Sequence, residues 1–200
     1  MKTRDAYPPA IYEADPDLKE FIRLRDLVPE NPTQALREIE GLADRGSAMS
    51  MLYIADALRT GSTYQQDLEK AEGWYRLVAH AGLPHGAHGL GLIHRMRNKY
   101  SQAVEEFEVG VQRGFAPSMN VLGLMCFNGE GVKKDILKAR RLWKRGIDLG
   151  NLWSKRNLAR ECVSVKFGVS NILYGILLFL SGTIDIPMIV WADRYSDRLR

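Results

Sequence analysis

The chain has 200 residues, which suits one compact domain with short appendages. Its two cysteines, Cys126 and Cys162, lie far apart, so composition excludes a disulfide-rich secreted fold, and we expect both thiols to be buried. The formal net charge of +4 is unevenly distributed, because residues 1–130 carry a net charge of −4 and residues 131–200 a net charge of +8.

Residues 1–29 predict a leader and a capping helix. The stretch from Met1 to Ala10 has no apolar core, so we expect no secretory signal peptide. Residues 17–28 have the pattern of a short amphipathic helix that covers the first face of the following domain. Its apolar side chains are Leu18, Phe21, Ile22 and Leu27.

Residues 30–162 contain one pattern four times: an alanine, ten residues and a glycine that closes a helix. The pairs are Ala35/Gly46, Ala71/Gly82, Ala103/Gly114 and Ala139/Gly150. The steps between these glycines are 36, 32 and 36 residues. This period is typical of stacked two-helix units, none of which can bury its apolar face alone.

Further positions keep a constant distance from the alanines and glycines. A bulky apolar residue follows each alanine by four: Ile39, Tyr75, Phe107 and Trp143. A large aliphatic residue lies eight positions after each glycine, and small residues lie four and nine positions after it. One face of this helix therefore allows a neighbouring helix to approach closely. Asn31, Asp67 and Asp135 stand where helix N-caps are expected, and the glycines suit C′ positions.

Two segments carry a family resemblance. Residues 67–82 and the run Gly129-Glu-Gly-Val-Lys-Lys-Asp135, which leads to Ala139, resemble Sel1-like repeats, relatives of the tetratricopeptide repeat. The resemblance covers about residues 31–162. It implies an all-α fold: a right-handed α-α solenoid of about four helix pairs. The unit at Ala103 departs from the family, because residues 96–101 lack the Gly-x-Gly-Val element, and the first unit is degenerate.

The resemblance implies a non-catalytic scaffold or adaptor that binds protein partners on a concave face lined by the first helix of each unit. Positions three, seven and ten after each glycine are expected to face away from the packing side. The candidate partner-binding residues at these positions are Tyr53, Asp56, His85, Leu92, Trp153, Asn157 and Arg160.

Residues 163–192 are predicted to be a hydrophobic, membrane-spanning segment with a helix over about residues 166–184, followed by a short basic tail over 193–200. From residue 167 to 184 there is no charge, and this length is sufficient for a transmembrane span. The residues assigned to the membrane segment are Phe167, Ile172, Leu177, Leu180, Asp185 and Trp191. We therefore expect a tail anchor with a cytoplasmic repeat domain and lipid contact beside the basic half. A buried cap or an oligomer interface is the alternative for this segment.

The sequence contains no recognised catalytic or cofactor motif. His85 and His88 lie three apart on a helix, but no third residue completes a metal-ligand pattern, so we expect no metal, no cofactor and no small-molecule ligand. The basic cluster lacks interleaved aromatics, and nucleic acid is not expected as a partner. Two alternatives to the membrane-anchored scaffold stay open: an accessory subunit whose hydrophobic helix docks into a membrane enzyme, and a soluble adaptor.

Overall fold

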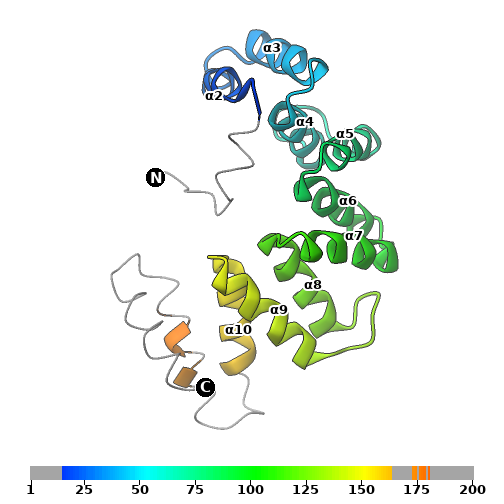
Figure 1. Cartoon of the computed structure of the whole chain (residues 1–200), viewed down its shortest axis with the longest axis vertical. Coiled ribbons are helices and arrows are strands. Elements are labelled where there is room, and N and C mark those ends of the chain that lie inside the picture. The colour runs from blue at the N-terminus through cyan, green and yellow to red at the C-terminus, as the bar shows by residue number, and fades with distance from the viewer. Residues whose placement is uncertain (1–14, 164–172, 175, 179, 181–200) are drawn as a thin grey trace. The chain divides into compact units, whose positions relative to one another are not determined.

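The computed structural model describes residues 15–163, 173–174, 176–178 and 180, and in these ranges helices joined by turns and loops are the only regular secondary structure (Figure 1). Most of the helices have the same length of 13 residues. Their bounds are α2 Leu18–Leu27, α3 Pro32–Asp44, α4 Ala48–Thr60, α5 Leu68–His80, α6 Pro84–Met96, α7 Tyr100–Gln112, α8 Ala116–Asn128, α9 Ile136–Asp148 and α10 Leu152–Val163.

The chain divides into two compact units. Unit 1 covers Met1–Phe115 and unit 2 covers Ala116–Arg200. In unit 1 each helix packs against the next one along the chain, from α2 to α7. In unit 2, α8 packs against α9, and α10 contacts both. The all-α repeat architecture is therefore confirmed, whereas the right-handed sense of the stack stays a prediction.

The helix ends lie where the sequence places them. Asp67 caps α5 by accepting hydrogen bonds from the backbone N–H groups of Glu69 and Lys70, at 3.1 and 3.0 Å. Asp135 caps α9 in the same way, with 2.8 Å between its Oδ1 and the Lys138 nitrogen. The four closing glycines all adopt the left-handed backbone that a C′ position needs, with φ values from 75° to 99°. The four glycines are Gly46, Gly82, Gly114 and Gly150.

The packing side has the predicted fit of large residues against small ones. The four repeat alanines are fully buried, and the bulky residues four positions later are at most 1% exposed. A Cβ atom at Gly91 would lie 2.8 Å from the Phe107 ring, and one at Gly123 would lie 2.5 Å from Trp143 Nε1. In these two helix pairs, the aromatic ring of the second helix therefore occupies space that only a very small side chain on the first helix leaves free.

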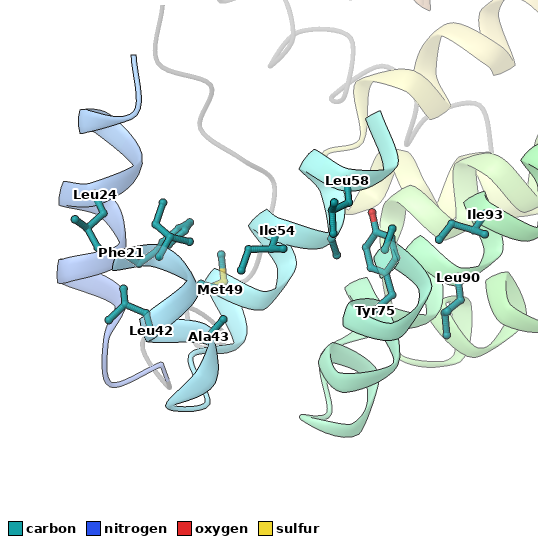
Figure 2. Packing of buried hydrophobic residues seen from close by; sticks show 13 residues of the cluster. Phe21, Leu24, Leu42, Ala43, Met49, Ile54, Leu58, Tyr75, Leu90 and Ile93 are labelled. Atoms are coloured by element: carbon teal, nitrogen blue, oxygen red, sulfur yellow. The ribbon is translucent and has the colours of Figure 1, made fainter. Parts of the chain in front are cut away.

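The apolar core of unit 1 extends from α2 to α6 (Figure 2). Phe21 and Leu24 of α2 lie beside Leu42 of α3, so α2 packs against the helix that follows it. The predicted apolar set was only partly right. Ile22 is 39% exposed, whereas Leu24 is 1% exposed, because Leu24 lies one turn from Phe21 on the same face.

The segment that precedes α2 is fastened to the first helix of the next repeat by Asp15. This buried carboxylate accepts hydrogen bonds from the Ser47 hydroxyl at 3.0 Å and from the Met49 backbone N–H at 2.9 Å. Ser47 is itself the N-cap of α4. Asp15 therefore supplements this cap from 32 residues away in sequence.

Much of the hydrophobic C-terminal segment lies outside the described residues. Phe167, Ile172, Asp185 and Trp191 belong to that part, as does the tail over 193–200. Leu177 and Leu180 are described and are 56% and 49% exposed. Among the described residues, none of the helices combines the length and the apolar character needed to cross a bilayer. The larger part of the predicted membrane-spanning helix lies outside the residues that the structure describes, and the helix stays a prediction.

Candidate interaction site

A set of exposed apolar and basic side chains shares one face of α10 in unit 2. Leu152 and Trp153 are 56% and 62% exposed, and Leu149, in the turn before the helix, is 47% exposed. Arg156 and Arg160 follow at helical spacing on the same face and are also exposed. We call these five residues the α10 surface. Because tryptophan and arginine are the residue types that most often dominate binding energy, this surface is the leading candidate site.

The tryptophan of this surface is held by a cation–π contact. The Arg156 guanidinium carbon lies 4.9 Å from the centre of the Trp153 ring, within the range of such an attraction. The contact leaves the indole mostly exposed and keeps a positive charge beside it. Trp153 is thus presented as a partly ordered anchor, which lowers the conformational entropy lost when a partner binds.

The opposite face of α10 is fastened to α8 and α9. Ser154 is fully buried, and Gly146 lies so close to it that a Cβ on the glycine would be 2.3 Å from the serine hydroxyl. The Asn151 side chain caps α10 by accepting a 2.8 Å hydrogen bond from the Ser154 N–H. Leu158, Ala159 and Cys162 are buried on the same side. Packing on this face directs the α10 surface outward.

A buried ion pair further fixes the rotation of α10. Arg140 of α9 donates two hydrogen bonds to the Glu161 carboxylate, at 2.7 and 2.9 Å, and Glu161 is only 3% exposed. Such a bidentate pair is geometrically demanding. Asn157 adds a 2.8 Å hydrogen bond from its side-chain nitrogen to Asn120 Oδ1 on α8. Of the sequence candidates, Asn157 therefore has a packing role at the edge of the surface.

The candidates of unit 1 form a second, separate group. The Asp56 carboxylate is exposed and accepts a 2.6 Å hydrogen bond from the Tyr75 hydroxyl and a 3.1 Å bond from Arg59. Arg59 also donates to the Tyr75 oxygen at 2.9 Å. Burial, and next the neighbouring Asp56 carboxylate, raises the pKa of Tyr75, so it remains a neutral donor. This network connects α4 to α5.

The other two candidates of unit 1 have limited exposure. Tyr53 is half-buried, with its ring 5.9 Å from that of Phe21, and Leu92 is half-buried on α6. The seven predicted residues therefore fall into a group in unit 1 and a group in unit 2, and each group is described within its own unit. Partner contact by these residues stays a prediction.

His85 is the clear correction among them. It is only 6% exposed, and its ring centre lies 4.6 Å from that of Phe115. His88 packs between Phe107 and Phe115, with ring centres 5.5 and 5.2 Å away. The expectation that His85 faces outward is wrong. Phe115, which directly follows the closing glycine Gly114, packs against the His85 ring at the start of α6 and covers it.

These two histidines predict a pH dependence of stability. Burial lowers the pKa of His85 to about 4 against a weak opposing effect of Asp56, and burial, with the neighbouring His85 and Arg59, lowers the pKa of His88 to about 3. An unfolded chain binds these protons near pH 6.5. The free energy of unfolding should therefore fall as the pH drops from about 6.5 towards 4. At about pH 5, the part of this loss that comes from His85 should be about 2 kcal/mol.

Urea unfolding at several pH values would measure this slope. His85→Leu should make the profile flatter, whereas Leu137→Ala, which removes an exposed side chain without a titratable group, should leave its slope unchanged. A profile that is equally steep in all three proteins would show that these imidazoles are not responsible. No cluster of metal-ligating side chains large enough to hold an ion occurs in the described part of the chain.

Sequence reasoning missed Leu149, Leu152 and Arg156 of the α10 surface. The equivalents of Leu152 and Arg156 in the other repeats are buried or half-buried, and those of Leu149 lie in turns, so only the exposure of these residues in the structure reveals the surface. One signal was available: Trp153 and Arg156 are three residues apart, and this spacing allows a cation–π contact on one helix face.

Comparison with known proteins gives one family and several structures. The model of the Sel1 repeat matches residues 48–83 and 116–151. A Sel1 repeat protein from Oxalobacter formigenes superposes with a TM-score of 0.66 at 18% identity, over 89% of this chain and 74% of that one. A protective antigen of uropathogenic Escherichia coli strains, which displays an SLR fold, has a TM-score of 0.62 at 23% identity.

That second superposition covers 76% of this chain and 33% of the antigen, so the present chain spans about a third of the antigen's length. At these identities the two likenesses show the fold alone. Among curated proteins, none matches the sequence. The helical-repeat architecture is therefore shared with solved proteins, and the choice of partner must be inferred from this chain's own surfaces.

Proposed function

The chain carries Sel1 repeats, and from this premise we propose that it is a non-catalytic scaffold that binds a protein partner through the α10 surface. Sel1 repeat proteins are generally protein-interaction scaffolds. α10 is the first helix of its unit, the helix that related repeats use to line a concave binding face. The observation that carries the proposal is the 62% exposed Trp153, held by Arg156 and flanked by exposed leucines.

The chemistry of the α10 surface selects one class of partner. Leu149, Leu152 and Trp153 offer apolar area, and the two arginines place positive charge at its edge. Residues 131–163 contain ten basic and three acidic side chains, so the field around this surface is positive. We expect a partner segment in which apolar residues alternate with carboxylates, because it would match both the apolar and the charged parts.

Truncation of the anchor tests this proposal. In affinity capture from cell extract with quantitative mass spectrometry, Trp153→Ala should weaken capture of the partner by about 30-fold, the effect of losing a hot spot worth roughly 2 kcal/mol. Leu137→Ala is the matched control, since Leu137 is 65% exposed in the same unit but belongs to α9. Equal capture by both variants and the parent chain would contradict the proposal.

We further propose that this scaffold works at a membrane, with its repeats on the cytoplasmic side. The net charge of +8 over residues 131–200 and the uncharged stretch from 167 to 184 support this location. Flotation of the full chain with lipid vesicles tests it, and a chain that stays at the bottom of the gradient with every lipid composition would contradict it. In that case the soluble adaptor would be the better description.

Docking into a membrane enzyme is the alternative for the same segment. It requires contacts from Asp185 to partner helices. Asp185→Leu should then reduce the yield of partner in a detergent pull-down. An unchanged yield would favour the scaffold over the accessory subunit.

A further inference from the structure

Four exposed aliphatic side chains lie beyond α10, on residues that the structure describes as helical. Leu173, Ile176, Leu177 and Leu180 are 57%, 42%, 56% and 49% exposed. Their spacing of three, four and seven residues places them on one helix face. Tyr174 and Leu178, between them, are half-buried. We call the four residues the apolar stripe.

The sequence around the apolar stripe continues the repeat. In the units that begin after Gly46 and Gly114, the second helix has an aspartate, an alanine and an aromatic residue at positions 21, 25 and 29 after the glycine. The same positions after Gly150 are an asparagine, a glycine and a phenylalanine. The three sets are Asp67, Ala71 and Tyr75; Asp135, Ala139 and Trp143; and Asn171, Gly175 and Phe179. The sequence after Gly150 departs from the repeat at position 36 after that glycine, where Ile186 replaces the glycine that closes the other units.

The exposure of the described residues agrees with this register. The apolar stripe occupies positions 23, 26, 27 and 30 after Gly150. On α9 the same positions after Gly114 are exposed or half-buried, as they are on α5 after Gly46. The residues are Leu137, Arg140, Arg141 and Lys144 on α9, and Glu69, Glu72, Gly73 and Arg76 on α5. These positions form the outer face of a second helix.

The geometry points to a helix that carries the apolar stripe, follows α10 as the second helix of its unit, and lies in the plane of an anionic lipid surface. This inference rests on the proposed membrane location, and it replaces a helix that crosses the bilayer with one that lies on it. On α5 and α9 the outer face is largely charged, whereas here all four positions are aliphatic. A stack in water would leave this area exposed, which soluble surfaces avoid.

The charge on the neighbouring repeat identifies lipid as the occupant. Equivalent positions on successive second helices form rows across a repeat stack, so Arg141 and Lys144 of α9 would flank Leu177 and Leu180. Both cations are exposed. An apolar stripe bordered by cations is the pattern of helices that lie at a membrane interface. A second copy of the chain is disfavoured, since it would bring two strongly basic halves together.

Vesicle flotation of the full chain tests this inference. The probes are vesicles of phosphatidylcholine alone and vesicles with about 30 mol% phosphatidylserine. We expect binding to the anionic vesicles that weakens with salt. Leu177→Glu/Leu180→Glu should weaken it about 100-fold, because two leucines no longer enter the interface. Arg141→Glu/Lys144→Glu should weaken it at least about 30-fold.

Lys19→Glu/Arg37→Glu, a double charge reversal at exposed positions of unit 1, is the control and should bind like the parent chain. Circular dichroism should show the same helix content in all variants. Binding that resists salt, alkaline carbonate and the Arg141/Lys144 reversal would overturn the in-plane helix while leaving the membrane location intact. Absence of binding to either vesicle would overturn both. A dimer in solution that the Leu177/Leu180 variant converts to monomer, without lipid binding, would instead assign the apolar stripe to a second copy.

Discussion

Trp143→Ala is expected to lower the free energy of unfolding by about 3–5 kcal/mol, a large part of the stability of a typical domain. The Trp143 ring is fully buried and fills the space that Gly123 leaves open. Its Nε1 donates a 3.2 Å hydrogen bond to the carbonyl oxygen of Asn120. Truncation would leave both a large cavity and a carbonyl group without this donor. Urea unfolding followed by far-UV circular dichroism measures the loss.

Trp153→Ala is the matched control, because it removes the same side chain from the same unit at a position that is 62% exposed. Its effect on stability should stay within about 0.5 kcal/mol, apart from the loss of the Arg156 contact. If the two variants lost similar stability, the aromatic position of the repeat would not be the packing centre of unit 2. The same pair separates stability from binding, since only Trp153 belongs to the α10 surface.

Gly86→Ala is expected to destabilise unit 1 by about 1–3 kcal/mol, although alanine favours helix over glycine. A Cβ at residue 86 would lie 2.3 Å from the backbone nitrogen and 2.6 Å from the Cα of Ala79. Neither atom can rotate away, so α5 and α6 would have to move apart. Thermal or urea unfolding of the purified chain would measure the change.

Gly73→Ala provides the opposite control. Gly73 lies inside α5, and a Cβ at this position would meet no other atom within 4 Å. This variant should therefore be more stable by about 0.5–1 kcal/mol, the ordinary gain from replacing a helical glycine. A destabilised Gly73→Ala together with a neutral Gly86→Ala would contradict the close approach of α5 and α6.

Most of the helical architecture could be predicted from the sequence, because short-range rules determine it. The N-cap aspartates, the left-handed glycines and the alternation of small and large residues all act within one helix or between neighbours in a pair. Gly91 with Phe107, and Gly123 with Trp143, are the clearest cases. Repetition strengthened the prediction, since each copy tested the positions found in the others.

The interaction site was harder to predict, because exposure depends on what covers a residue from outside its own helix. Position three of the repeat is buried at His85, beneath Phe115, and exposed at Trp153. Nothing within α6 or α10 distinguishes the two. The hydrophobic C-terminal segment is ambiguous from sequence alone, because its composition suits a membrane span while Asn171, Gly175 and Phe179 keep the repeat spacing.

Site-specific photo-crosslinking tests the proposed scaffold function most directly. A p-benzoylphenylalanine in place of Arg160 would lie on the α10 surface and leave the Trp153–Arg156 contact intact, and the same replacement of Leu137 provides the control. After irradiation in cell extract, the account predicts a discrete protein adduct from position 160 that is absent from position 137 and is lost when Trp153→Ala is added. Identical adducts from both positions, or an adduct from position 160 that survives Trp153→Ala, would contradict it.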